Sequence, residues 1–163
     1  MNTHDIASTL AGLFAEITTG APKDGAFIVN PNDPGMIGSL EKLSAADASR
    51  SMNDGATIAA HSAHVTYGLS LMNRWAREGG NPFADAKWNE AWKITSVEED
   101  RWKQIRADLE KEIMYWQEAL KIPREVMPIE MSGMIGSIAH TAYHLGAIRQ
   151  IHPLTRGPKE GTS

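Results

Sequence analysis

The sequence predicts an all-α protein, specifically a four-helix bundle with a long first connection and short extra helices. Two observations lead to this prediction: four long segments repeat apolar residues at three- and four-residue spacings, and no segment shows a convincing strand pattern. The chain has 163 residues and no cysteine, so a hydrophobic core must hold the fold without disulfides. We expect one domain over residues 1–153 and a flexible tail over residues 154–163.

The first helix is predicted from about Asp5 to Thr19, because apolar residues recur there on one helical face: Ile6, Leu10, Leu13, Phe14 and Ile17. A glycine and a proline then end it. Residues 21–55 are rich in glycine and proline, which permits only short helical pieces at 36–43 and 45–52. This segment is the long first connection.

The second helix is predicted over residues 58–78, with Thr57 as its N-cap, because a threonine hydroxyl can accept a hydrogen bond from a free amide of the first turn. Two glycines end the helix. The next segment contains Trp88 and Trp92 with little helical period, so we predict a loop that folds over the body of the protein. These two tryptophans are candidates for the lid of a pocket.

Ser96 and Glu99 form a capping-box pattern, which predicts the start of the third helix. Pro123 ends that helix, and Pro128 opens a fourth, whose broad apolar stripe ends near Pro153. Three tryptophans lie at helical spacing among leucines and isoleucines, and we predict them to be core residues: Trp75, Trp102 and Trp116.

The charge pattern excludes several classes of partner. The chain has 16 basic and 20 acidic side chains, a formal net charge of −4, and its basic residues are scattered. A nucleic-acid surface would gather them on one face. No apolar stretch approaches the roughly 18 residues needed to span a bilayer, and the N-terminus lacks a signal-peptide pattern. We therefore expect a cytoplasmic protein with no nucleic-acid or membrane partner.

Four of the six histidines form two close pairs, His61 with His64 and His140 with His144, on the second and fourth predicted helices. Side chains four apart on a helix lie one above the other, so two imidazoles can bind one ion at about 2.0–2.1 Å each, and a spacing of three serves nearly as well. Neighbouring helices would bring three or four nitrogens to one site.

The alternative is that each pair is a coincidence of hydrogen-bonded core or rim histidines. Four buried imidazoles without a common partner would leave polar nitrogens unsatisfied, which favours a metal. A mononuclear imidazole site suits a divalent ion such as zinc, nickel or iron. Within the first pair we favour His64, which shares its face with small residues, and keep His61 as an alternative or additional ligand. His4 and His152 are expected to be exposed.

Other metal signatures are missing. The fourth-helix pair has no Glu directly after its first histidine, so it lacks the general base of the helical zinc-protease motif. No Glu lies three positions before a histidine, which argues against a di-iron carboxylate bundle. The sequence therefore predicts a site built from imidazoles alone.

Residues 138–151 (IAHTAYHLGAIRQI) resemble the H-x3-H-x-G-Q-I signature of the DinB/YfiT-like family of metal-binding four-helix bundles, with Ala147 where Gln is frequent. Residues 57–65 resemble the family segment in which a Ser or Thr opens a helix and a His followed by an aliphatic residue comes seven residues later. The resemblance covers most of the chain. It implies a three-His site of His64, His140 and His144, completed by water or substrate, and a homodimer, which family members often form.

The resemblance also implies an activity. Family members with known activity include S-transferases that act on low-molecular-weight thiols such as bacillithiol and mycothiol, and others are assigned as metal-dependent hydrolases. Our first hypothesis is therefore a metal enzyme that joins a small thiol to an electrophile. A metal can hold a thiol deprotonated, and the thiol must be a cosubstrate because the chain has no cysteine.

Two other hypotheses stay open. The first is a hydrolase, in which the same metal supplies hydroxide at neutral pH and Glu130 or Asp54 is a candidate base. The second is a stress-linked, non-enzymatic bundle whose metal fixes the packing of the helices. A closed site with four protein ligands would favour this last reading, because a catalytic metal keeps one position free.

Overall fold

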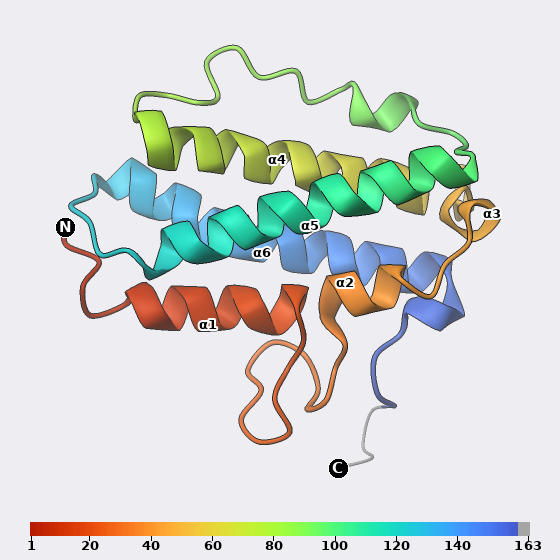
Figure 1. Ribbon diagram of the computed structural model, residues 1–163, viewed down its shortest axis with the longest axis horizontal. Helices are drawn as coiled ribbons and strands as arrows, with labels where there is room; N and C mark the ends of the chain where they lie inside the picture. The colour runs from red at the N-terminus through yellow and green to blue at the C-terminus, as the bar shows by residue number, and fades with distance from the viewer. Residues whose placement is uncertain (160–163) are drawn as a thin grey trace.

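A computed structural model of the chain describes residues 1–159 and consists of helices and loops, with one isolated bridge between Asn2 and Glu125. The long helices are α1 (Ala7–Thr18), α4 (Ile58–Glu78), α5 (Glu99–Lys121) and α6 (Pro128–Ile151). The short ones are α2 (Gly35–Leu40), α3 (Ala45–Ala48), and the 3-10 turns η1 (Ala91–Lys93) and η2 (Pro153–Thr155). The predicted all-α fold, with a long first connection and short extra helices, is confirmed (Figure 1).

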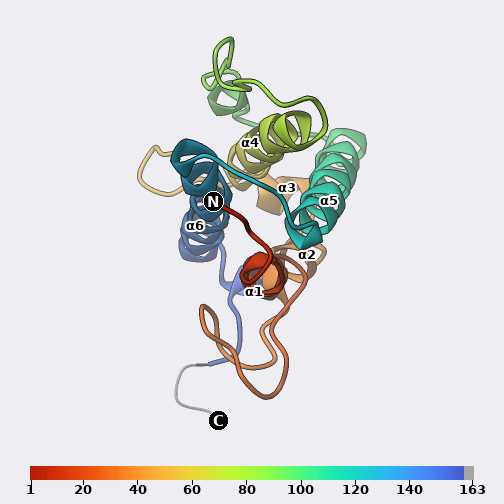
Figure 2. The same ribbon diagram turned by 90° about the vertical axis from the view of Figure 1, so that its left-hand side faces the viewer.

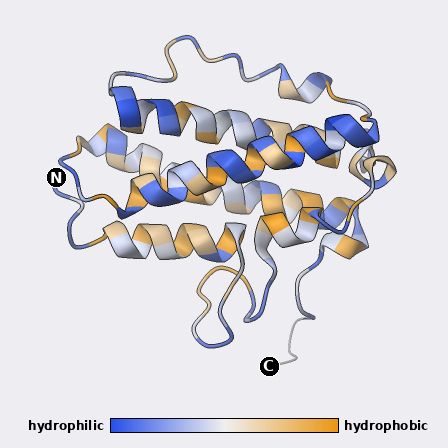
Figure 3. Ribbon diagram, in the orientation of Figure 1, coloured by the Kyte–Doolittle hydropathy of each residue, from blue (hydrophilic) through white to orange (hydrophobic). Residues whose placement is uncertain are grey.

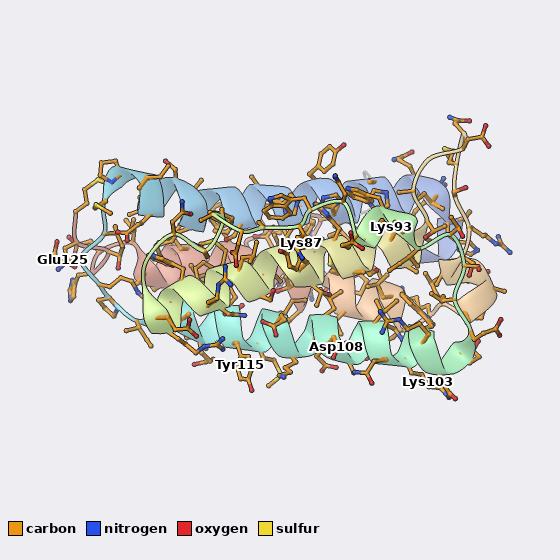
Figure 4. The ribbon with its side chains drawn as sticks, turned by 90° about the horizontal axis from the view of Figure 1, so that it is seen from above. Lys87, Lys93, Lys103, Asp108, Tyr115 and Glu125 are labelled. Atoms are coloured by element: carbon orange, nitrogen blue, oxygen red, sulfur yellow. The ribbon has the colours of Figure 1, made fainter. Side chains whose placement is uncertain are left out.

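The long helices form a bundle in which α1 and α4 are diagonal to each other, because each of them packs against both α5 and α6 (Figure 2). Helices α4 and α5 run in the same direction, opposite to α1 and α6 (Figure 1). Because α4 and α5 are parallel, the chain between them must run back along the whole length of α4, which is about 31 Å for its 21 residues. Residues 79–98 make this crossing, above the seam between α4 and α6, where Lys87 and Lys93 lie (Figure 4).

The core lies where the apolar faces of the long helices meet, and each of these helices carries both hydrophilic and hydrophobic residues (Figure 3). Trp102 and Trp116 are fully buried and Trp75 is nearly so, which confirms the prediction for the helical tryptophans. The buried indole nitrogens of Trp102 and Trp116 donate to the Leu43 carbonyl and the Ser137 hydroxyl. The core therefore satisfies these polar atoms itself.

Two of the three predicted helix starts are confirmed. The Thr57 hydroxyl accepts a hydrogen bond from the Ala60 amide at 3.1 Å, and Pro128 is the first residue of α6. The capping box of Ser96 and Glu99 is wrong, because α5 begins at Glu99 itself and no side chain caps it.

The Glu99 carboxylate has a different partner: it accepts a hydrogen bond from the Ala45 amide at 2.9 Å, at the first turn of α3. That turn also carries its own capping box, formed by Ser44 and Asp47. The Glu99 carboxylate therefore binds a residue 54 positions away instead of the backbone next to Ser96. A local sequence pattern cannot show such a distant partner.

Two buried carboxylates organise the first connection. Glu16 accepts hydrogen bonds from three successive backbone amides, those of residues 27–29. Asp33 accepts from the Gly35 amide at 2.8 Å and pairs with Arg149 of α6 at 2.6 Å. These contacts tie the connection to α1 and to the end of α6.

The 3-10 turn η2 includes residues 154 and 155, which the sequence assigned to the tail. Thr155 of η2 is buried, and its hydroxyl donates to the His152 carbonyl at 2.6 Å. His152 is also buried, with its Nε2 3.2 Å from Asp47, so the expectation of an exposed His152 is wrong, whereas His4 is exposed. The last part of the predicted tail, residues 160–163, lies outside the described residues. Among residues 1–159, no helix has both the length and the apolar character needed to cross a membrane.

Candidate metal centre

The two histidine pairs meet in the interior of the bundle. His61 and His64 lie in the first two turns of α4, and His140 and His144 lie in the second half of α6. Because these neighbouring helices are antiparallel, the start of α4 faces the later part of α6. His64 and His144 are buried, at 8% and 3% exposure, and the other two are partly buried. The topology therefore joins pairs that are far apart in the sequence.

Three of the histidines direct ring nitrogens toward one point. The Nε2 atom of His140 lies 3.0 Å from Nε2 of His64 and 3.0 Å from Nε2 of His144. Two nitrogens bound to one ion at about 2.05 Å are about 2.9 Å apart at an angle of about 90° and about 3.3 Å apart at about 109°. The observed separations match that range, so this group could hold a metal ion.

Hydrogen bonding among the histidines alone satisfies this arrangement poorly. A neutral imidazole offers one N–H donor and one acceptor nitrogen. The single Nε2 of His140 faces two other nitrogens and can take only one of the two roles at a time. In addition, the buried Nδ1 of His64 has no hydrogen bond of normal geometry, and an interaction with the Trp88 backbone only partly offsets the lowering of the His64 pKa. A cation bound by the lone pairs of all three Nε2 atoms would satisfy them at the same time.

The histidines of the cluster are neutral at pH 7. Burial, which penalises the charged imidazolium, is the main cause and acts together with the neighbouring histidines to lower the pKa of His64 to about 4 and that of His144 to about 3. Burial also lowers the pKa values of His61 and His140 from the ordinary 6.5. Neutral imidazole is the form that binds metals, so no proton has to be displaced from these rings at pH 7.

His61 lies behind the three converging nitrogens. Its Nδ1 is 2.9 Å from Nδ1 of His144, the ring nitrogen that does not face His140. The group of three nearby ligand atoms consists of His64, His140 and His144. The sequence left His61 open as an alternative or additional ligand, and the structure brings it against a member of the group.

The two loop tryptophans lie over the cluster, where the sequence expected a lid. The Trp92 ring stacks on the His64 ring, with centroids 4.2 Å apart and planes 26° apart, and is itself 38% exposed. Trp88 lies against His64 with ring centroids 5.5 Å apart. Tyr143, between the two α6 histidines in the sequence, is exposed, and its ring lies edge-on to the His144 ring with centroids 5.1 Å apart.

Hydrogen bonds to α4 hold this loop in place. The Thr57 hydroxyl, which caps α4, donates to the Ile94 carbonyl at 2.7 Å. The Tyr67 hydroxyl accepts from the Lys87 amide at 2.8 Å. Arg74 donates to the Pro82 carbonyl near the start of the loop. The sequence predicted Thr57 only as a helix cap. It did not predict any of the three contacts with the loop, because these contacts depend on how the loop folds back onto α4.

Neither carboxylate proposed as a general base is hydrogen-bonded to the cluster. Glu130 accepts from the Trp75 indole and the Met127 amide at the start of α6. It precedes His140 by ten residues, about 15 Å along the helix. Asp54 is exposed in the turn before α4. Within residues 1–159, no carboxylate is hydrogen-bonded to any of the four clustered histidines.

Comparison of the chain with protein-family models, with curated proteins and with solved structures found no match. The resemblance to the DinB/YfiT-like family therefore remains a prediction from two sequence motifs.

Proposed function

We propose that this chain is a metal-dependent enzyme in which His64, His140 and His144 hold a divalent ion, with zinc, nickel and iron as the candidates, and the ion activates a low-molecular-weight thiol. The observation that carries the proposal is that Nε2 of His140 lies 3.0 Å from Nε2 of both His64 and His144, in a group whose three ligand atoms all lie within 4.8 Å of one another. Three protein ligands are typical of catalytic centres, where a further position is left for substrate, whereas structural sites use four.

The surroundings of the cluster favour a thiol over water as the activated group. A bound divalent ion holds a coordinating thiol in its deprotonated form without help from a protein base. A hydrolase gains from a positioned carboxylate, and neither Glu130 nor Asp54 is hydrogen-bonded to the histidines. In the transfer, the thiol proton leaves to solvent, a sulfur–carbon bond forms, and the bond from that carbon to its leaving group breaks.

His61 has a positioning role in this proposal. When Nε2 of a neutral histidine binds a metal, its Nδ1 carries the proton and becomes a donor. The Nδ1 of His144 then donates to Nδ1 of His61, 2.9 Å away. This hydrogen bond fixes the orientation of the His144 ring, as carboxylates and carbonyls do behind other metal-binding histidines.

The first experiment measures metal content by plasma mass spectrometry on tag-free protein incubated with zinc, nickel or iron. We expect about one metal per chain in the wild type and a loss of metal in His64→Ala and His140→Ala. His4→Ala is the matched control, because His4 is exposed and outside the cluster. A wild type that takes up no metal under any loading would overturn the proposal.

The second experiment tests the reaction with glutathione or cysteine as thiol and chlorodinitrobenzene as electrophile. We expect thiol consumption that requires the metal, both reactants and the three histidines. Metal-dependent cleavage of a p-nitrophenyl ester without any thiol, together with no thiol transfer, would replace the transferase with a hydrolase.

A further inference from the structure

Two neighbouring cavities run along the seam between α4 and α6, below the loop of residues 79–98. The cavity next to the histidine cluster has a volume of about 200 Å³, and the lining includes Gly68, Leu69, Trp88, Gly136 and His140. The other has a volume of about 490 Å³ and lies toward the start of α6, where Trp75, Pro82 and Ile129 line it. Both are also lined by Met72, Phe83 and Gly133. We call these two adjoining cavities together the α4–α6 groove.

Glycines in the two helices create this groove. A Cβ at Gly133 would lie 3.4 Å from the Met72 methyl group, and a Cβ at Gly68 would lie 3.5 Å from Cε1 of His140. A Cβ at Gly136 would meet no atom within 4 Å. Glycine is a weak helix former, so its repeated use here is unfavourable for the helices themselves. What these glycines provide is open space beside a candidate metal ligand.

The walls of the groove are aromatic, aliphatic or glycine along most of its length. Polar side chains line both cavities: His140 and Ser137 in the cavity next to the histidine cluster, and Glu130 and Asn81 in the other cavity. The Ser137 hydroxyl already accepts from the Trp116 indole and donates to the Met134 carbonyl, and the Asn81 side chain accepts from the Phe83 amide. Glu130 already accepts two hydrogen bonds from the chain. A ligand in this groove therefore meets apolar surface along its body and a metal-binding histidine at one end.

We propose that the α4–α6 groove binds the apolar part of the substrate, an alkyl or aryl chain, and places the reacting group at the three-His centre. The inference rests on the proposed function and narrows it to substrates with an elongated apolar body. The volumes agree with this assignment: a cavity of about 150 Å³ accepts a benzene ring, and sites for small organic molecules span about 300–1,000 Å³.

The test compares two hydroxamates, which share a metal-binding head and differ in their chains. Acetohydroxamate and octanohydroxamate are titrated calorimetrically into zinc-loaded protein. Full burial of one methylene gives at most about a fourfold gain in affinity. We expect octanohydroxamate to bind at least about 30-fold more tightly to the wild type. Equal affinities of the two compounds would overturn the proposal.

A variant pair locates the effect. A Cβ at Gly136 meets no atom within 4 Å, so the side chain of Gly136→Leu can extend into the groove. This variant should reduce the chain-length gain to within about threefold, because octanohydroxamate loses far more affinity than acetohydroxamate, which has no long chain. Gly12→Leu is the matched control, since Gly12 is also a helical glycine with open space around its Cβ and lies on α1. An equal loss in both variants, or no loss in Gly136→Leu, contradicts the assignment.

A measurement on metal-free protein separates this inference from the proposed function. The methyl group of Met72 lies in the groove, whereas Met114 is exposed on α5. Carbon-13 methyl spectra of methionine-labelled protein, titrated with 1-octanol, should shift the Met72 signal and leave that of Met114 in place. A Met72 shift without metal uptake would support the groove while the metal centre fails. Metal uptake and acetohydroxamate binding with no Met72 shift would overturn the groove alone.

Discussion

Two clusters of buried polar side chains lie in different parts of the bundle, and they differ in how far the chain itself satisfies them. In the first connection, Glu16 is held by three backbone amides and Asp33 by an amide and Arg149. In the histidine cluster, the Nε2 atoms of His64 and His144 have the same neighbour within hydrogen-bonding distance, Nε2 of His140. The two carboxylates of the first cluster are satisfied by the residues present, although the buried Nε of Arg149 has no hydrogen-bond partner. The histidine cluster lacks a common partner for its converging nitrogens.

This difference separates a structural role from a binding role. A buried carboxylate that accepts hydrogen bonds from the chain favours one conformation. Removing it leaves its buried donors unsatisfied, which lowers the stability of the folded protein. A group of neutral nitrogens around one point contributes little to the fold until a cation joins them. Substitutions in the first cluster should therefore lower stability without changing metal binding, and those in the second should do the reverse.

The largest effect is expected at Asp33. Asp33→Ala leaves the Arg149 guanidinium, whose side chain is only 16% exposed, without its counter-charge. We expect the free energy of unfolding to fall by about 3–5 kcal/mol. Urea denaturation measures this loss, and mass spectrometry of the folded fraction should find the wild-type metal content. A variant as stable as the wild type would show that this pair does not hold the connection.

His64→Phe should show the opposite pattern. Zinc binding by four ligands is worth about 10–16 kcal/mol, so one ligand contributes about 2.5–4 kcal/mol, or about 70- to 900-fold in affinity. Phenylalanine keeps a ring against Trp92 and removes an Nδ1 atom that has no hydrogen bond of normal geometry. The metal-free protein should therefore change in stability by less than about 1 kcal/mol. If this variant were unfolded at neutral pH, the histidine cluster would have a structural role even without metal, and the proposed difference between the two clusters would be wrong.

Glu16→Gln tests the amide-bound carboxylate by a smaller change. Glutamine keeps one carbonyl acceptor but loses the charge and one acceptor oxygen, while three backbone amides still point at the site. We expect a loss of about 2 kcal/mol in unfolding free energy. Glu41→Gln, at an exposed position after α2, is the control and should be neutral.

Substitutions of His61 test whether this residue orients His144 or binds the metal itself. His61→Phe removes the acceptor behind His144 and should weaken metal affinity about 10–100-fold without removing the site. His61→Asn offers a carbonyl acceptor and should recover part of this loss. Competition with a chromophoric chelator measures both affinities. Complete loss of metal in both variants would instead make His61 a direct ligand.

The smallest effect near neutrality is the pH dependence of the metal-free protein. Folding lowers the pKa values of His64 and His144 to about 4 and about 3, below the ordinary 6.5. The unfolded chain therefore binds more protons as the pH falls below 6.5, and the stability present above that pH is lost progressively. We expect a decrease on the order of 1 kcal/mol between pH 7 and pH 6. His64→Phe should show a weaker dependence in urea denaturation.

The sequence was sufficient for the long helices because their signals are local. Thr57 and Pro128 mark helix starts by chemistry within one turn, and both are confirmed. The Ser96 and Glu99 pattern failed because the Glu99 carboxylate binds the Ala45 amide in another segment. His152 was misread for the same reason, since its partner Asp47 lies on α3. Local patterns predict a helix well, but they do not show a competing partner that is distant in the chain.

The candidate site divides in the same way. The sequence alone determined that two histidine pairs sit at helical spacing and that a loop with two tryptophans follows the second long helix. Only the tertiary structure decided which nitrogens converge, that His61 lies behind His144, and that a glycine-lined groove begins at His140. Helical spacing depends on the backbone of a single segment, whereas convergence depends on how two antiparallel helices pack together.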